Sequence, residues 1–330
     1  MQSPLVIGLL IIGALWLMIQ CGKLMIRSIS ILARRWGLSE FILSFLLIAF
    51  ATSLPELAIG INSALAGVPE LSFGDILGTN IVNLTLIIGV TAVIGRSITV
   101  SDYAHFKSNR LYQLVIVLAP MILLLDGTLS RLDGGILLGL FIWNLFRFLN
   151  IDNAHERKVL RPHLVEHATM AVPEHPGVTW RYLGLLLVSA AGLGVATFII
   201  VTAAETIAIA LSIPTVLIGI LIIATCSSLP ELTVGVRSVL SGKGGVAIGD
   251  VFGAAAFNAT LTLGLVALIK PIILPSITIV LLGIGFTLVS YFLVFYFLHT
   301  KQAISRGEGL LLLGMYGLFI LAQIAVITHG

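Results

Sequence analysis

Long apolar runs, separated by short polar, glycine-containing or proline-containing stretches, follow one another along the whole chain. Most of these runs approach the roughly 20 residues that an α-helix needs to cross a bilayer. We therefore predict ten membrane-spanning helices, two of which are long enough to be tilted or broken. The predicted spans cover residues 4–22, 38–66, 71–94, 111–126, 134–150, 180–211, 214–240, 246–269, 273–298 and 308–328.

The composition places the chain among the all-α polytopic membrane proteins. Of its 330 residues, 58% are hydrophobic and only 10% are charged, which is more apolar surface than a soluble core of this length requires. The net charge of +3 is small, and the basic residues lie between the apolar runs. The sequence therefore indicates a lipid bilayer rather than a nucleic acid as the partner, and it implies no obligatory protein partner. Cys21 and Cys226 form no disulfide or metal-binding motif.

The Lys and Arg residues predict how the spans are oriented. If the N-terminus faces outward, 16 of the 18 basic residues fall in inward loops or at inward span ends, and only Arg131 and Lys270 lie outside. Both termini then face outward, and the two halves insert with opposite orientation. We therefore predict two inverted-topology five-helix repeats, at residues 1–150 and 180–330, joined by a cytoplasmic linker at 151–179. Such inverted repeats place the substrate near the midplane, where the repeats meet.

One long stretch of sequence occurs in both halves. Residues 49–89 and 224–264 align without a gap, and 17 of the 41 aligned positions are identical. Both copies carry Ser-Leu-Pro-Glu inside an apolar run, and both have an Asn at the same place further on, Asn83 in one and Asn258 in the other. A charged residue deep in lipid costs about 2.5–3.5 kcal/mol. A chain that carries this cost twice, at Glu56 and Glu231, is expected to use both carboxylates in one site.

Each copy combines a helix-opening proline with side-chain oxygen atoms. Pro55 cannot donate a backbone hydrogen bond and presses against the carbonyl group one turn earlier, so we expect the helix to kink or open there. Freed carbonyl groups at membrane depth must face protein or a cavity. Thr52 and Glu56 are spaced by one helical turn and share a helix face. The second copy repeats this arrangement with Ser227 and Glu231.

The next predicted span of each copy adds further groups. Thr79 and Asn83 share one face in the first copy, and Ala254 and Asn258 take the matching positions in the second. The polar groups offer oxygen and include no His or Cys, so they suit hard cations such as Ca²⁺ or Na⁺ rather than soft transition metals. Two carboxylates would neutralise one Ca²⁺. Small residues should let these helices pack closely, and they are Gly74, Gly78, Gly249 and Gly253.

These motifs resemble those of a known family. ATSLPE followed by GTNIVN, and CSSLPE followed by GAAAFN, are similar to the alpha-repeats of the calcium/cation antiporter superfamily. The resemblance is to its sodium/calcium exchanger-like members, whose repeats read GTSLPE and then GSNxxN. It covers both repeats and the ten-span inverted layout, and it implies an antiporter and not an enzyme.

The resemblance also implies the ligands of the transported ions. For Ca²⁺ it implies two central carboxylates with hydroxyl and amide groups beside them: Glu56, Glu231, Thr52, Ser227, Asn83 and Asn258. For Na⁺ it implies hydroxyl groups and backbone carbonyls: Ala49, Ser53, Thr79, Ala224 and Ser228. No cofactor is expected apart from these transported ions.

The chain departs from the family pattern at several positions. Thr79 keeps the hydroxyl of the GSN motif but Ala254 does not, and the resemblance implies that this hydroxyl helps to form the outward-side Na⁺ site. The amides at the two Asn positions leave a fixed central charge near −2. Asp75 and Asp250 replace the usual Asn of the family. They either cap a helix N-terminus, where the dipole favours an anion, or line vestibules that collect cations, Asp75 outside and Asp250 in the cytoplasm.

Two further features leave alternatives open. Glu205 has no acidic counterpart in the other repeat and either reaches the membrane interface or helps cations to reach the site. His163 and His167 have the helical spacing of a metal pair, but without a fixed ligand set a solvated linker is the preferred interpretation.

The leading hypothesis is an antiporter of the cell (plasma or inner) membrane that exchanges Ca²⁺ for Na⁺ by alternating access. In it the first and sixth spans slide against the rest. The alternative is Ca²⁺/H⁺ exchange, in which the same two glutamates carry the protons. A membrane-embedded protease would need two carboxyls that share a proton, and the oxygen-rich setting argues against it. A passive channel lined by Glu is usually built from several subunits, whereas this chain supplies its own pair.

Overall fold

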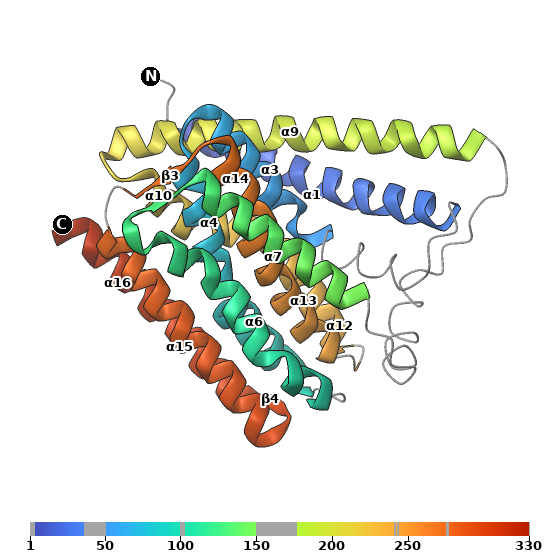
Figure 1. Ribbon diagram of the computed structural model, residues 1–330, viewed down its shortest axis with the longest axis vertical. Coiled ribbons are helices and arrows are strands. Elements are labelled where there is room, and N and C mark those ends of the chain that lie inside the picture. The colour runs from blue at the N-terminus through green and yellow to red at the C-terminus, as the bar shows by residue number, and fades with distance from the viewer. Residues whose placement is uncertain are drawn as a thin grey trace.

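A computed structural model describes residues 4–35, 51–99, 103–149, 177–240, 242, 244–274 and 277–329. This part of the chain is almost wholly helical (Figure 1). In chain order its helices are α1 (Pro4–Arg35), α3 (Ala51–Ala66), α4 (Pro69–Ile81), η2 (Val82–Ile87), α5 (Ile88–Gly95), α6 (Tyr103–Leu123), η3 (Leu124–Asp126), α7 (Arg131–Leu149), α9 (Gly177–Leu211), α10 (Thr215–Ile218), η4 (Gly219–Ile223), α11 (Ala224–Ser227), α12 (Leu229–Leu240), α13 (Gly244–Phe257), η5 (Asn258–Thr262), α14 (Leu263–Ile269), α15 (Ile277–Lys301) and α16 (Arg306–His329).

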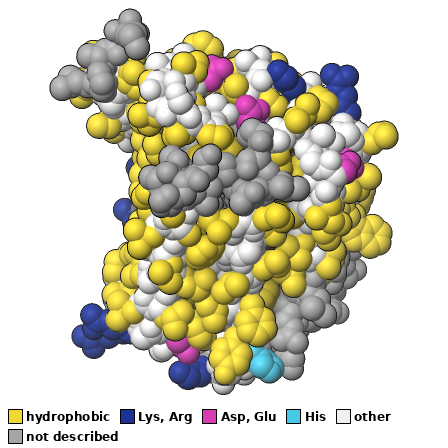
Figure 2. Space-filling model, turned by 90° about the vertical axis from the view of Figure 1, so that its left-hand side faces the viewer, with side chains coloured by type: hydrophobic (Ala, Val, Ile, Leu, Met, Phe, Trp, Pro, Cys, Tyr) yellow, Lys and Arg dark blue, Asp and Glu magenta, His cyan; other side chains and the backbone are white. Residues whose placement is uncertain are grey.

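The helices identify an integral membrane protein. Within the described residues, six helical segments are long and apolar enough to cross a bilayer. Hydrophobic side chains cover most of the face in Figure 2, and charged side chains gather mainly toward its upper and lower margins. The six segments are Val6–Leu24, Pro69–Gly95, Thr179–Leu211, Ala247–Ile269, Leu281–Lys301 and Arg306–Ala325.

The observed helices follow most of the predicted spans, although residues 38–50 of the second predicted span lie outside the described residues. The helix that begins the chain continues to Arg35, although residues 23–35 were expected to form an inward loop. Those residues contain no proline and are mostly good helix formers, so the basic side chains extend the helix instead of ending it. Helix α6 also begins earlier than its predicted span, at Tyr103 instead of 111. Helix α9 runs unbroken from Gly177 to Leu211, so of the tilt or break that its length suggested, no break is seen.

Two short antiparallel ribbons join helix ends, and the sequence pattern gave no sign of them. β1 (Ser97–Thr99) pairs with β4 (Ala303–Ser305), and β2 (Thr128–Leu129) pairs with β3 (Ile272–Ile273). Each ribbon takes one strand from each half of the chain. The offset that aligns the two sequence copies also brings β1 onto β3 and β2 onto β4, so the ribbons match each other as the copies do.

Helices α1 and α9 lie side by side at one edge of the molecule and cross the direction of α6, α15 and α16 (Figure 1). Each packs most extensively on the other, and both also contact α3. The Asn62 side chain of α3 donates a hydrogen bond of 2.6 Å to the hydroxyl of Thr197 in α9. The pair is thus attached to the rest of the protein mainly through α3.

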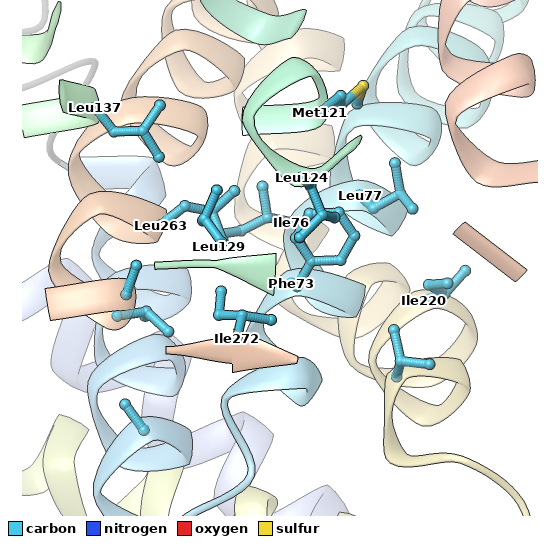
Figure 3. Close-up of a cluster of buried hydrophobic side chains, with 14 of the residues drawn as sticks. Phe73, Ile76, Leu77, Met121, Leu124, Leu129, Leu137, Ile220, Leu263 and Ile272 are labelled. Atoms are coloured by element: carbon cyan, nitrogen blue, oxygen red, sulfur yellow. The ribbon is translucent and has the colours of Figure 1, made fainter. Parts of the chain in front are cut away.

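Helix α4 is held by apolar packing on one face. Figure 3 shows Phe73, Ile76 and Leu77 of α4 among buried side chains that include Leu124 and Met121. The β2–β3 ribbon contributes to the same cluster. This packing fixes the rotation of α4, and therefore the direction of the polar residues on its other faces.

Glycines bring α4 onto η4 and α10 at backbone distance, as predicted for the first copy. A Cβ atom on Gly74 would lie 2.2 Å from the carbonyl oxygen of Val216, and one on Gly78 would lie 2.4 Å from that of Ile220. Gly219 meets the carbonyl of Leu71 in the same way, at 2.4 Å. A Cβ atom added to the matching Gly249 or Gly253 would have no described neighbouring helix within 4 Å. Their predicted close packing is therefore not seen in the described residues.

We expect Gly74→Ala to destabilise the protein by at least about 1–3 kcal/mol, the usual cost of overpacking. Its new methyl group would meet the Val216 backbone, which cannot rotate away as a side chain could. The measurement is thermal unfolding of the purified protein in detergent. Gly139→Ala in α7 is the control, because the space around Gly139 is open. Equal unfolding of the two variants would contradict the tight contact of α4 with α10.

Candidate functional site

Four carboxyl groups are buried in the middle of the helical elements just described. Glu56 of α3, Asp75 of α4, Glu231 of α12 and Asp250 of α13 are each 0–1% exposed. Asp75 is the charged neighbour that acts most strongly on Glu56, and Glu56 is the one that acts most strongly on Glu231. The structure therefore brings the two predicted glutamates together, and it adds two aspartates to them.

Asp75 and Asp250 do not occupy the positions expected from the sequence. Helix α4 begins at Pro69, so Asp75 lies in its second turn and not at its N-terminus. Asp75 accepts a hydrogen bond of 3.2 Å from the hydroxyl of Ser227. Both aspartates are buried. The helix-cap interpretation is wrong for Asp250 too, because α13 begins at Gly244. For Asp75, the glycines of α4 bring the middle of that helix against α11.

The same observation bears on the expected central charge of −2. That value counted only Glu56 and Glu231 as acidic groups. Asp75 and Asp250 both act electrostatically on the glutamates, so the site contains four carboxyl groups. Coulomb interactions are strong where water is excluded, so these carboxyl groups influence one another. Two more carboxyl groups are therefore available to balance bound cations than the expected charge counted.

The predicted hydroxyl ligands differ in how they are engaged. The side-chain oxygens of Ser53 and Thr79 are fully buried and have no hydrogen-bond partner in the described residues. Ser228 donates a hydrogen bond of 2.7 Å to the carbonyl of Ala224. The Ser227 hydroxyl lies 3.4 Å from that same carbonyl. The Ala224 carbonyl therefore lies beside the Ser227 hydroxyl, so both oxygens could bind the same ion.

Two predicted ligands cannot be placed. Ala49 lies outside the described residues. The backbone of Thr52 belongs to the first turn of α3, but its side chain is outside the described part of the structure.

The helix of the second copy is interrupted beside the glutamate, as its proline predicts. Helix α11 ends at Ser227, Ser228 leaves helical geometry with φ −81° and ψ 5°, and α12 begins at Leu229. A π-helical segment, η4, directly precedes α11. In the first copy α3 stays helical from Ala51 through Pro55, so no opening is seen within its described residues.

Both predicted amides lie in π-helical segments, which sequence reasoning missed. Asn83 is in η2 and Asn258 begins η5, and π-bulges are frequent at functional sites. In each segment a threonine hydroxyl donates to a carbonyl of the preceding turn: Thr85 to Ile81 and Thr260 to Ala256. Segment η2 packs against α12 and η5 against α3, so each amide lies on a segment beside the glutamate helix of the other copy.

The two amides have different surroundings. Asn83 has no hydrogen-bond partner for either amide atom among the described residues. Asn258 accepts a hydrogen bond of 3.5 Å from the hydroxyl of Thr262. The matching residue in the first copy is Ile87, which offers no hydroxyl. The copies are therefore unequal here, as they are at Thr79 and Ala254.

Many side-chain oxygen atoms around the carboxyl groups are buried and have no hydrogen-bond partner among the described residues. Buried polar atoms are nearly always hydrogen-bonded or bound to water or ions. Within the described residues, no three His, Cys, Asp or Glu side chains are close enough to hold one metal. An ion here would complete its shell with hydroxyl, amide and backbone oxygens. The unpartnered oxygens belong to Ser53, Glu56, Asp75, Thr79, Asn80, Asn83 and Glu231.

The family model that describes the sodium/calcium exchanger protein matches residues 5–150 and 181–325. The chain belongs to this family. The family consists of membrane transporters, so the protein is a cation exchanger of this family and not an enzyme.

Relatives agree with this assignment. The chain is 33% identical over 270 residues to the inner membrane protein YrbG of Escherichia coli (strain K12), with 80% of each chain covered. It is 25% identical over 339 residues to the sodium/calcium exchanger MaX1 of Methanosarcina acetivorans, with 94% of this chain and 96% of MaX1 covered.

The fold is that of a solved exchanger. The structure of the sodium-calcium exchanger NCX_Mj soaked with 2.5 mM Na⁺ and 0.1 mM Sr²⁺ matches with a TM-score of 0.61 and 26% identity, covering 96% of this chain and 99% of that one. NCX_Mj soaked with 2.5 mM Na⁺ and 0.1 mM Ca²⁺ matches with a TM-score of 0.60 and 25% identity, covering 97% and 99%.

We expect Glu231→Gln to raise the stability of the ion-free protein by about 1–3 kcal/mol, because it removes a buried negative charge that lies among other carboxyl groups. Thermal unfolding in detergent, with a chelator and without Na⁺, measures this change. Glu205→Gln is the control, since Glu205 is a partly exposed carboxyl of α9. A clear loss of stability in Glu231→Gln alone would show that Glu231 has a compensating partner.

Proposed function

We propose that the protein exchanges Ca²⁺ for Na⁺ across the membrane by alternating access, with Glu56 and Glu231 as the central Ca²⁺ ligands. The observation that carries this proposal is the pair of fully buried glutamates, one from each repeat, whose oxygens have no hydrogen-bond partner in the described residues. Ca²⁺ prefers six to eight oxygen ligands. Family membership and the soaked NCX_Mj structures support the choice of ions.

The other ligands complete this proposal. For Ca²⁺ they are Thr52 and Ser227 with Asn83 and Asn258. For Na⁺ they are hydroxyl and carbonyl groups, of which Thr79, Ser227 and the Ala224 carbonyl belong to one neighbourhood around Asp75. The remaining Na⁺ ligands are Ala49, Ser53 and Ser228.

We infer that ten spans form two inverted five-helix repeats, at residues 1–150 and 180–330, with both termini outside. Several contacts recur at matching positions of the two copies, and these support the inference. A Cβ on Gly60 would lie 3.0 Å from Thr262, and one on Gly235 would lie 3.5 Å from Ile87. The two ribbons and the two π-helical segments correspond in the same way. The name of YrbG supports an inner membrane location.

Access to the site would alternate by movement of α1 and α9. These helices pack on each other more than on the rest of the protein, so they can shift as a pair. An apolar cavity of about 20 Å³ separates part of this pair from η4 and α11 and is lined by Leu15, Ala204 and Ser227, among others. Movement of α1 and α9 would therefore open the structure next to Ser227, which is a proposed ligand.

A second candidate function is Ca²⁺/H⁺ exchange with the same two glutamates. The observation that favours it is at the Na⁺ position of the second copy, where Ala254 and Ala255 are fully buried and offer no side-chain oxygen. A proton needs fewer ligands than a metal cation. The first copy keeps Thr79 and Asn80 at the matching positions, and for this reason Na⁺ remains the first candidate.

Reconstituted vesicles test the proposal. We expect an imposed Na⁺ gradient to drive Ca²⁺ uptake by the wild-type protein, and Glu56→Gln and Glu231→Gln to reduce uptake to background, because each removes one of the two charges that balance Ca²⁺. Glu205→Gln is the comparison for a neutralised carboxyl elsewhere in a membrane helix, and it should transport normally if Glu205 only reaches the membrane interface.

Two results would overturn parts of the proposal. Uptake driven by a pH gradient and not by a Na⁺ gradient would replace Na⁺ with H⁺. Uptake that survives in both glutamate variants would refute the assigned site.

Ala254→Ser tests the inequality of the two copies. If the lost hydroxyl weakens Na⁺ binding, restoring it should raise the apparent Na⁺ affinity of exchange, because a buried hydroxyl gains a cation as its partner. The measurement is Ca²⁺ uptake as a function of Na⁺ concentration. Unchanged Na⁺ dependence would mean that another group or a water molecule already fills this position.

A further inference from the structure

Asp75 is a carboxyl group that the fold holds within the site. It lies on α4, is 0% exposed, and accepts a hydrogen bond of 3.2 Å from Ser227 of the other repeat. The close approach of Gly74 and Gly78 to the backbone of α10 and η4 sets this contact. The buried cluster of Figure 3 anchors another face of the same helix. The position of Asp75 is therefore set both by the contact with the other repeat and by the apolar packing of α4.

Several oxygen atoms surround this carboxyl. Thr79 lies one turn further along α4, on the same face of the helix as Asp75. The hydroxyl of Ser227 lies 3.4 Å from the Ala224 carbonyl. These oxygens come from two elements, α4 and α11, that belong to different repeats. A carboxylate, two hydroxyls and a carbonyl thus share one small buried region.

Some of these atoms lack partners. The Oδ2 atom of Asp75 and the hydroxyl of Thr79 have no hydrogen-bond partner among the described residues, although both side chains are fully buried. The Ser227 hydroxyl donates its hydrogen to Asp75, which leaves its lone pairs available. The charged neighbours that act on Glu56 here are other acids. The region therefore lacks positive charge and has acceptor atoms to offer.

We propose that Asp75 is a direct carboxylate ligand for Na⁺, in a site that it forms with Thr79, Ser227 and the Ala224 carbonyl. The proposal rests on the proposed function and deepens it, because it places one counter-ion at a negatively charged position. All four groups are hard oxygen ligands. One carboxylate balances the single charge of Na⁺, and the glutamates are then left for the divalent ion.

The second repeat provides a matched comparison. Asp250 corresponds to Asp75 and is equally buried. The position that corresponds to Thr79 is Ala254, which has no side-chain oxygen. Neutralising either aspartate removes the same charge from the four-carboxyl unit, but only Asp75→Asn also removes a ligand from the oxygen set that contains Thr79. The two variants therefore separate direct ligation from a general electrostatic effect.

The experiment measures binding to the purified protein in detergent at fixed pH. Radioactive Na⁺ is bound directly in Ca²⁺-free buffer, and Ca²⁺ affinity is measured in Na⁺-free buffer. We expect Asp75→Asn to weaken Na⁺ binding by about tenfold or more, because ligand charge strongly tunes the affinity of oxygen sites, and to weaken it clearly more than Asp250→Asn does. The two variants should change Ca²⁺ affinity to a similar extent.

Thr79→Val supplies an independent measurement, because it removes a hydroxyl without changing charge or size. It should weaken Na⁺ binding and leave Ca²⁺ affinity nearly unchanged. Equal effects of Asp75→Asn and Asp250→Asn on Na⁺ binding would overturn the proposal, as would Na⁺ binding that ignores all three changes or is absent from the wild-type protein.

The same measurements keep the two proposals apart. Na⁺ binding that depends on Asp75, in a protein that binds no Ca²⁺, would refute the proposed exchange function and support the Asp75 site. Ca²⁺ binding that requires Glu56, together with Na⁺ binding that does not require Asp75, would support the exchange site and overturn the Asp75 assignment.

Discussion

Burial of negative charge is the constraint on which the architecture of this protein depends. A carboxylate removed from water is very unfavourable unless cations, protons or hydrogen-bond donors compensate it. Here four carboxyl groups are buried, and the strongest charged neighbours of Glu56 and Glu231 are other carboxyl groups of this set. Such a cluster is unfavourable while its carboxylates are charged and uncompensated, and it becomes favourable when cations bind. Binding of ions then stabilises the fold as well as serving transport.

Close helix packing creates this cluster. Glycines at positions 74, 78 and 219 let α4 meet α10 and η4 at backbone distance, so that a side chain in the middle of α4 reaches Ser227 of the other repeat. Larger residues there would separate the two elements, and Asp75 would lose its hydrogen-bond partner. The small residues are therefore as much a part of the site as the polar residues that they bring together.

Much of this arrangement was predictable from the sequence, and the reasons for the failures are physical. The apolar runs gave most of the helices, and the duplicated Ser-Leu-Pro-Glu gave Glu56 and Glu231. The positions of Asp75 and Asp250 were wrong because both were expected at a helix start, whereas α4 already begins at Pro69. The sequence did contain one sign of their role, because aspartate occupies this aligned position in both copies. The π-helical turns were missed because they are short segments inside longer helices, and they leave the apolar pattern of the span unchanged.

The differences between the two copies carry as much information as their similarity. A symmetric site would offer each ion two equal positions, whereas here one aspartate is accompanied by Thr79 and the other by Ala254. The amide of Asn258 is bonded to Thr262, and that of Asn83 has no such partner in the described residues. Each conformation of an alternating-access cycle exposes the site to one side. Unequal oxygen sets can therefore give the counter-ion different affinities on the two sides, although the central glutamates are shared.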